Sequence, residues 1–231
     1  MKIEKIDLDK KFDIIYIDPP WAYDEVNHGG KKPLRSSKAV SPTQLTGSAD
    51  EHYNTVHIND LKEWDFSHIC NDNCLMFMWA VSPNLDQAID LGVTWGFEYI
   101  TVGFVWDKMK AIPGNYTISQ VELCLLFKKG KIPDTKYGFD PQQKTSNRAG
   151  IRNTLQYYAQ RSKRHSSKPH EFRRRIYEMF PLNSKIEIFA RQKYPDWDAW
   201  GNDIKLKEEI QEYDVSKIFN SYDGHKRKEN K

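Results

Sequence analysis

The sequence predicts an α/β protein with a mainly parallel sheet and helices on both faces. Three observations support this prediction. Five short segments are apolar on both pleat faces, which is typical of strands covered from both sides. Helical patterns fall between several of these segments. The chain has 231 residues, enough for one domain with a sizeable core.

The strand-like segments are rich in branched and aromatic residues. The first is FDIIYI at residues 12–17. The others are 74–80, 100–106, 121–127 and 185–190. Because polar residues are sparse in all five, we expect them to form the buried centre of the sheet.

Two helices have clear beginnings. Ser82 and Pro83 are a capping residue and a first-turn proline, and the helix that they open should end near Gly96. Pro169 opens the second helix. Its apolar face consists of Phe172, Ile176, Met179 and Phe180.

Two polar segments, 24–52 and 107–119, interrupt this alternation and are expected to be loops. Both leave the carboxyl ends of predicted strands, where ligands bind in open α/β sheets. We therefore expect both to border the functional site and to recognise the substrate. For 24–52 the alternative is a disordered insertion, because its composition is also common in disorder.

Composition narrows the class of protein. A net charge of +3 permits a nucleic-acid partner without requiring one. Three cysteines in no disulfide-like or metal-binding pattern indicate a reducing, cytoplasmic setting and no metal. The longest apolar run, CLMFMWAV, is too short to cross a membrane, and the charged start of the chain does not resemble a signal peptide. We expect no membrane partner.

The first strand runs directly into Asp18, Pro19, Pro20 and Trp21. The prolines stiffen the backbone, so that Asp18 and the neighbouring carbonyls form a rigid set of acceptors beside an aromatic wall. Such a pocket suits a planar ring that carries an exocyclic amine. The Asp18 carboxylate and the Pro19 carbonyl could accept its two hydrogens and turn its lone pair towards an electrophile. The alternative is a strand-ending turn with Trp21 as a core residue.

This tetrapeptide resembles the signature of the MT-A type adenine-N6 methyltransferases, the family of the seventy-kilodalton mRNA adenosine methyltransferase subunit. The resemblance runs from about Phe12 to Asp203. Further matching stretches occur in order: HYNTVHINDLKEW, LMFMWAVSP, GFEYITVGFVWDK, VELCLLFKKGK, RHSSKPHEF and KIEIFARQKYPDWDAWGND. The motifs are specific to the family as a set, because chance agreement of all of them in this order is implausible.

The resemblance implies a Rossmann-like, S-adenosylmethionine-dependent methyltransferase with a permuted strand order. One catalytic domain would span 1–204, followed by a partly flexible extension, 205–231. The implied reaction is methyl transfer to the N6 amine of adenine in DNA, with the base flipped out of the helix. The alternatives are RNA adenosine, the N4 amine of cytosine, or a catalytically weak nucleic-acid-binding subunit.

Family matches also assign cofactor contacts. Asp18 and Lys168 would contact the cofactor, and Lys168 would bind the cofactor's carboxylate. An ammonium group beside the start of a helix favours such an anion. Glu187, Phe189 and Arg191 alternate along one strand, so we expect them on one side, near the ribose and methionine parts. For Glu187 the alternative is a structural ion pair, since a buried carboxylate needs partners.

Three further positions follow from the resemblance. Asn202 matches a ribose contact, and Asp203 stands where many relatives have Gln or Glu. Tyr53 would join the catalytic residues by closing over the reacting amine, or would anchor its loop. Glu122 and Asn115 are weaker candidates for supporting the site.

Basic residues with interleaved aromatics, concentrated between 148 and 175, favour a nucleic-acid path to the pocket, although charge runs are often only solvated faces. A compact chain resembles the prokaryotic and phage branch of the family, and this favours DNA as the substrate. It also favours a role in restriction-modification and a location in the cytoplasm of a bacterium or phage-infected host. Relatives often form dimers, so a homodimer is one of the alternatives. The candidate nucleic-acid contacts are Lys31, Lys32, Arg35, Lys108, Lys110, Arg148, Arg152, Arg161 and Arg164.

Overall fold

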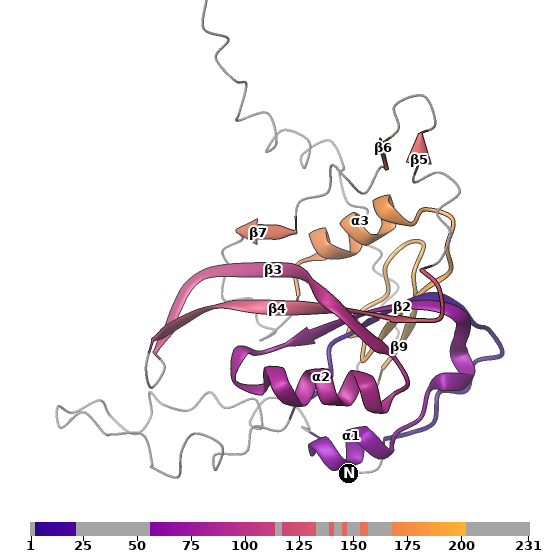
Figure 1. Ribbon diagram of the computed structural model, residues 1–231, viewed down its shortest axis with the longest axis horizontal. Coiled ribbons are helices and arrows are strands. Elements are labelled where there is room, and N and C mark those ends of the chain that lie inside the picture. Colours follow the sequence, from indigo (N-terminus) through magenta and orange to yellow (C-terminus); the bar gives the residue numbers. More distant parts are fainter. Residues whose placement is uncertain are drawn as a thin grey trace, which may run out of the picture.

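A seven-stranded sheet forms the centre of the computed structural model (Figure 1). The structure describes residues 3–21, 56–113, 117–132, 139–140, 145–146, 153–156 and 168–201. The strand order is β7-β3-β4-β2-β1-β8-β9. These strands are β1 (Phe12–Ile17), β2 (Cys70–Ala80), β3 (Glu98–Pro113), β4 (Ile118–Lys129), β7 (Thr154–Gln156), β8 (Lys185–Ile188) and β9 (Asp198–Trp200). A small separate sheet pairs β5 (Phe139–Asp140) with β6 (Thr145–Ser146).

The α/β prediction is confirmed, but the sheet is mixed where a mainly parallel one was expected. Within this sheet β4 pairs antiparallel with both β2 and β3, whereas the other pairs are parallel. The reason lies in the chain between β3 and β4. Parallel neighbours need a crossover of a dozen or more residues, and the link 114–117 is too short for one. β4 therefore returns as a hairpin partner and inserts between β3 and β2.

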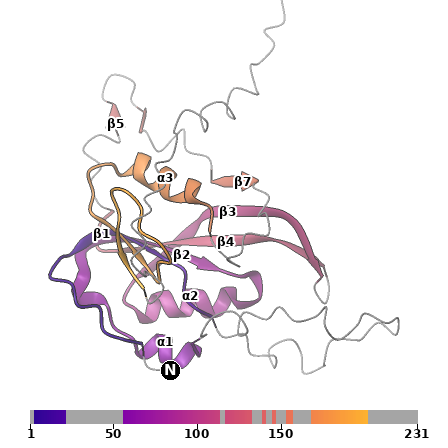
Figure 2. The same ribbon diagram turned by 180° about the vertical axis from the view of Figure 1, so that it is seen from behind.

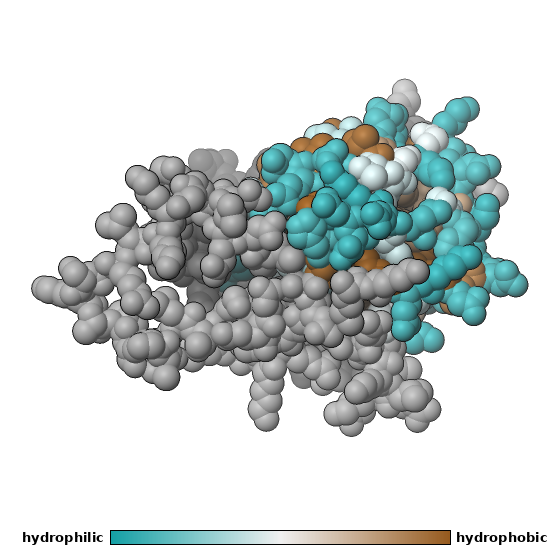
Figure 3. Space-filling view, turned by 90° about the horizontal axis from the view of Figure 1, so that it is seen from below, coloured by the Kyte–Doolittle hydropathy of each residue, from teal (hydrophilic) through white to brown (hydrophobic). Residues whose placement is uncertain are grey.

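Helices cover both faces of the sheet, as predicted. Helices α1 (Ile58–Glu63) and α2 (Leu85–Thr94) lie on one face and α3 (His170–Met179) lies on the other, and the reverse view agrees (Figures 1 and 2). Short 3₁₀ turns, η4 (Ser67–Ile69) and η5 (Ser82–Asn84), precede β2 and α2. The outer face on the side of α1 and α2 is mainly hydrophilic (Figure 3).

Alternating residues of β1 build the two cores. Ile15 and Ile17 belong to the core beneath α1 and α2, whereas Ile14 and Tyr16 belong to the core beneath α3. Side chains of a strand point alternately to its two faces, so a strand that is apolar throughout can be buried from both. This burial fixes the end of β1, where Asp18 follows.

The predicted helices are present. The differences concern where strands end and four short strands, β5, β6, β7 and β9, that the sequence did not predict. The first predicted helix begins as η5 and continues as α2, and Gly96 follows with φ +84°. The segment 107–119, expected as a loop, is largely strand, because β3 runs to Pro113 and β4 begins at Ile118. This hairpin extends past the end of β2, beyond the centre of the sheet (Figure 1). Among the described helices, none is long and apolar enough to cross a membrane.

Candidate active site

Asp18 stands at the carboxyl edge of the sheet, directly after the buried strand β1. Its side chain is 25% exposed, so the carboxylate lies between the core and solvent. The following residues turn tightly, since the Trp21 amide donates to the Pro19 carbonyl at 2.8 Å. The Pro20 carbonyl accepts from the Val56 amide at 2.8 Å and so joins this turn to the chain before α1. The rigid backbone expected for the two prolines therefore has hydrogen bonds that hold it.

Lys168 lies at the same edge of the sheet, although it is far from Asp18 in the sequence. It directly precedes Pro169, the N-terminal capping residue of α3. Its Nζ lies 2.7 Å from Asp18 Oδ2, although 150 residues separate the two in sequence. The side chain of Lys168 is 5% exposed, so this ion pair is shielded from solvent on the lysine side.

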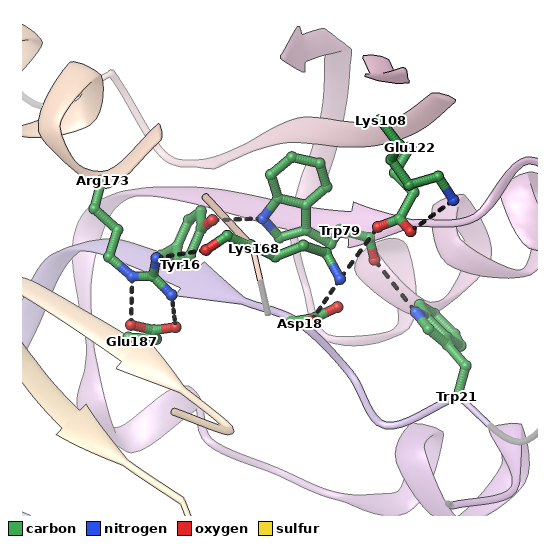
Figure 4. A network of polar contacts seen from close by, with 9 residues as sticks. All are labelled: Tyr16, Asp18, Trp21, Trp79, Lys108, Glu122, Lys168, Arg173 and Glu187. Atoms are coloured by element: carbon green, nitrogen blue, oxygen red, sulfur yellow. Dashed lines mark hydrogen bonds and ion pairs between the residues drawn. The ribbon is translucent and has the colours of Figure 1, made fainter. Parts of the chain in front are cut away.

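Glu122 is the second carboxylate on Lys168. Its Oε2 lies 3.3 Å from Lys168 Nζ, and its Oε1 lies 3.2 Å from Lys108 Nζ (Figure 4). Lys108 was expected to contact nucleic acid, but its side chain is only 15% exposed and its ammonium faces Glu122. Two ammonium groups and two carboxylates thus alternate along one chain of contacts, Lys108, Glu122, Lys168 and Asp18.

This alternation sets the charge state of the site. Burial alone would lower the pKa of Lys168, but the Asp18 and Glu122 carboxylates raise it above its ordinary value. Burial likewise opposes ionisation of Glu122, but Lys168 and Lys108 lower its pKa below the ordinary value. Lys168 is therefore a cation, and Glu122 an anion, at neutral pH.

Trp79 packs against Lys168 of the ion pair, and Trp21 is hydrogen-bonded to Trp79 (Figure 4). Lys168 Nζ lies 5.5 Å from the centre of the Trp79 ring, a cation–π contact. Trp79 Nε1 donates to the Tyr16 hydroxyl at 2.7 Å, and the Trp79 carbonyl accepts from Trp21 Nε1 at 3.3 Å. Trp21 itself is 6% exposed and belongs to the core beneath α1 and α2. Its burial agrees with the core role that was the alternative and not with an open stacking wall.

Glu187 is held by an arginine that the sequence did not single out. Arg173, on α3, binds both carboxylate oxygens of Glu187 on β8, through Nε at 2.6 Å and through Nη2. Arg173 also donates from Nη1 to the Lys168 carbonyl at 3.3 Å. Its guanidinium lies over the rings of Tyr16 and Tyr194, 4.9 Å and 4.3 Å from their centres. The structural ion pair weighed for Glu187 is therefore present.

Phe189 does not share a side with Glu187, contrary to the expected alternation. β8 ends at Ile188, and Phe189 has φ +59°, so the period of two does not continue. Its ring packs on Trp64 and Trp200, on the side of α1, whereas Glu187 faces α3. Arg191 lies beyond this reversal and is half-buried.

Two arginines at the end of the basic run, Arg174 and Arg175, form ion pairs within the protein. Arg174 pairs with Glu171 and Glu178 along α3. Arg175 pairs with Glu171 at 2.9 Å and donates to the Thr154 carbonyl on β7 at 2.8 Å. These contacts tie α3 to the edge strand, so this part of the run is structural.

Several predicted positions lie outside the described residues and stay predictions. They are Tyr53, Asn115, Asn202, Asp203, Lys31, Lys32, Arg35, Arg148, Arg152, Arg161, Arg164, the side chain of Lys110 and the whole segment 24–52. Within the described ranges, no three His, Cys, Asp or Glu side chains are grouped as a metal site requires.

The ion pair suits one class of ligand group. An α-amino acid carries a carboxylate and an ammonium on neighbouring atoms, the charges opposite to those of Lys168 and Asp18. Such a group can enter by exchanging partners, its carboxylate with Lys168 and its ammonium with Asp18, so that no charge is left unpaired. The residues present therefore fit the amino-acid end of S-adenosylmethionine.

Comparison with known proteins places most of the described chain in one family. The model of the MT-A70 family matches residues 12–203, from β1 to beyond β9. A type II methyltransferase, M.MunI, from a Mycoplasma species is 40% identical over 201 residues. The match covers 84% of this chain and 78% of that relative. The residues that form the ion-pair chain all lie inside the matched region.

Proposed function

Since the chain belongs to the MT-A70 family, we propose that it transfers a methyl group from S-adenosylmethionine to the N6 amine of adenine in DNA. The observation that carries this proposal is the 2.7 Å contact between Asp18 and Lys168 at the end of β1. It brings the acceptor for an amine and the cation for a carboxylate to one point. Methyl transfer agrees with the similarity to a type II methyltransferase.

Lys168 and Asp18 would hold the amino-acid end of the cofactor. When bound, S-adenosylmethionine supplies an electrophilic methyl group on its sulfonium. The ammonium of Lys168 would turn from Asp18 to the cofactor's carboxylate. Its ion pair with Glu122 would keep it at the carboxyl edge of the sheet. The Trp79 ring and the Lys168 carbonyl, held by Arg173, limit how far the lysine can move.

The adenine amine would then donate hydrogen bonds to Asp18 and to the Pro19 carbonyl, and the proton that its nitrogen loses on gaining the methyl group would pass to the Asp18 carboxylate. That carbonyl already accepts from the Trp21 amide, but a carbonyl oxygen has two lone pairs. Two acceptors on one amine pull its lone pair out of conjugation and turn it towards the methyl group. Because the turn is held by hydrogen bonds on both sides, these acceptors are fixed before the base arrives, which favours the aligned reaction.

DNA is the proposed acceptor because it agrees with the similarity to a type II methyltransferase. RNA adenosine and the cytosine N4 amine are outcomes that the test separates. An amine inside a duplex lies within the base stack, so the target base has to leave it. A role in restriction-modification fits the type II name of the similar protein.

The test is methyl transfer by the purified chain. Incubation with labelled cofactor and duplex DNA, followed by mass spectrometry of the nucleosides, should give N6-methyldeoxyadenosine. Asp18→Ala should lower the rate at least about a hundredfold, because one preorganised acceptor is lost. Glu98→Gln, which removes a carboxylate on the exposed surface of β3, is the matched control and should retain the rate of the parent.

Three outcomes contradict the proposal. Transfer to RNA or to cytosine would change the acceptor. Nucleic-acid binding without transfer would make the chain a binding subunit. Equal rates for Asp18→Ala and the parent would remove Asp18 from the chemistry.

A further inference from the structure

β3 contains a wide bulge close to the ion-pair chain. Asp107 pairs with Val121, and the next registered pair is Ile112 with Ser119. Residues 108–111 of β3 thus lie opposite a single residue of β4, Gln120. Asp107 Oδ1 accepts from the Met109 amide at 2.9 Å and from Gln120 Nε2 at 2.7 Å, so both strands hold the bulge at its start.

Of the two bulge residues whose side chains the structure describes, Lys108 and Met109, Met109 is the exposed one, and its backbone is strained. Its φ is +52°, a left-handed conformation that residues with a Cβ rarely adopt. Phe189 has a similar φ but packs its ring on Trp64 and Trp200. Met109, by contrast, is 52% exposed. Single exposed apolar residues are common, but one that is half exposed on a strained backbone indicates a function outside the fold.

The bulge places Met109 beside the candidate active site. The preceding residue, Lys108, turns inward, with its Nζ 3.2 Å from Glu122. Adjacent Cα atoms are only about 3.8 Å apart, so Met109 lies at the same edge. The last residue of β2, Ala80, pairs with Leu123, and the hairpin beyond this pair extends past the end of β2 (Figure 1).

We propose that Met109 is a wedge that enters the target duplex where the flipped adenine leaves its stack. The inference rests on the proposed function, because a wedge has a role only where a base leaves the helix. Proteins that unstack DNA insert apolar side chains such as Met between bases. An unbranched, polarisable side chain adapts to the gap. The Asp107 hydrogen bonds hold the backbone at Met109, so the side chain is presented from a fixed position.

The test compares Met109→Ala with Met109→Leu on two duplexes. One has the target adenine paired with thymine, and the other has it opposite a mismatch. On the paired duplex, Met109→Ala should lower the single-turnover rate about tenfold to a hundredfold, and Met109→Leu should retain most of it. On the mismatched duplex, where the base leaves the stack more easily, Met109→Ala should recover to within about threefold of the parent.

A second measurement reports flipping directly. With 2-aminopurine in place of the target adenine, the parent should raise the fluorescence on binding and Met109→Ala should raise it much less. Leu182→Ala removes an apolar side chain that is 65% exposed, on the turn after α3, and should match the parent in every assay.

The results of these experiments distinguish failure of the Met109 proposal from failure of the proposed methyl transfer. A Met109→Ala variant as active as the parent on paired DNA, or equally impaired on both duplexes, overturns the wedge while methyl transfer stands. A parent that neither methylates DNA nor raises the fluorescence contradicts both proposals.

Discussion

At the scale of single residues, the site is a balance of buried charges. Asp18 and Glu122 share the ammonium of Lys168, and Glu187 is neutralised by Arg173. Such pairs add little net stability, because removing charges from water offsets most of their attraction. These pairs fix the positions of the side chains, because a buried charge that loses its partner is left uncompensated.

The pair of Arg173 and Glu187 gives the clearest test at this scale. Both residues are 6% exposed. Arg173→Met leaves the carboxylate of Glu187 buried without its partner and should lower the free energy of unfolding by about 3–5 kcal/mol. The double variant Arg173→Met with Glu187→Leu removes both charges and should recover most of this loss. Urea denaturation of the three proteins measures the difference, and a double variant no more stable than the single one would contradict the account.

How well the sequence predicted the site also depends on single residues. Asp18 and Lys168 could be found because a proline follows each, at a strand end and a helix start. Arg173 could not, because three arginines stand in a row and only the turn of α3 decides which one faces β8. Trp21 was expected as an aromatic wall beside Asp18, with a core residue as the alternative, and the core beneath α1 and α2 encloses it.

At the scale of elements, α2 approaches the sheet through a glycine. A Cβ at Gly92 would overlap the ring of Phe127 on β4, which is fully buried and packs edge-on against Tyr99. The absence of a side chain thus sets how closely the helix lies on the strands.

Gly92→Ala should therefore destabilise the protein although alanine favours helices. Overpacking costs about 1–3 kcal/mol, and the helix propensity of alanine returns about 1 kcal/mol. Val93→Ala, at a position on the same helix that is 54% exposed, should change the free energy of unfolding by less than about 0.5 kcal/mol. Thermal or urea denaturation checks both, and a more stable Gly92→Ala variant would show that Phe127 can move aside.

The strand ends were the least predictable part of the elements. The apolar centres of β1, β2, β3, β4 and β8 could be found by their composition. The polar end of β3 could not, because there the pairing with β4 defines the strand and the local composition does not. The reversal at Phe189 was also invisible, since a positive φ in a non-glycine residue comes from its surroundings.

At the scale of the whole molecule, carboxylates paired with buried cations make stability depend on pH. Burial opposes ionisation of Glu122 and Glu171, but the lysines around Glu122 and the arginines around Glu171 lower both pKa values below 4.5. A carboxyl whose pKa is lower in the folded than in the unfolded chain binds its proton more readily after unfolding. Its stabilisation is therefore present above about pH 4.5 and is lost as the pH falls through the folded-state pKa.

We expect the free energy of unfolding to fall steeply below about pH 4.5. Burial also lowers the pKa of His170 below 6.5, which makes stability begin to fall near that pH. Urea denaturation between about pH 3.5 and about pH 7 measures the curve. Glu122→Gln with Glu171→Gln should flatten its acid part, whereas Leu182→Ala should not. The same slope in the double variant and the parent would assign acid unfolding to other groups.

The sequence by itself determined the class of fold, the strand that carries Asp18 and the helix start that carries Lys168. These depend on local composition, capping and proline, which a short window contains. Only the tertiary structure decided which partners meet. The antiparallel return of β4 brings Glu122 and Lys108 to Lys168, the turn of α3 selects Arg173 for Glu187, and the core takes Trp21. Such pairings depend on how separate elements pack together, and no local pattern in the chain specifies that.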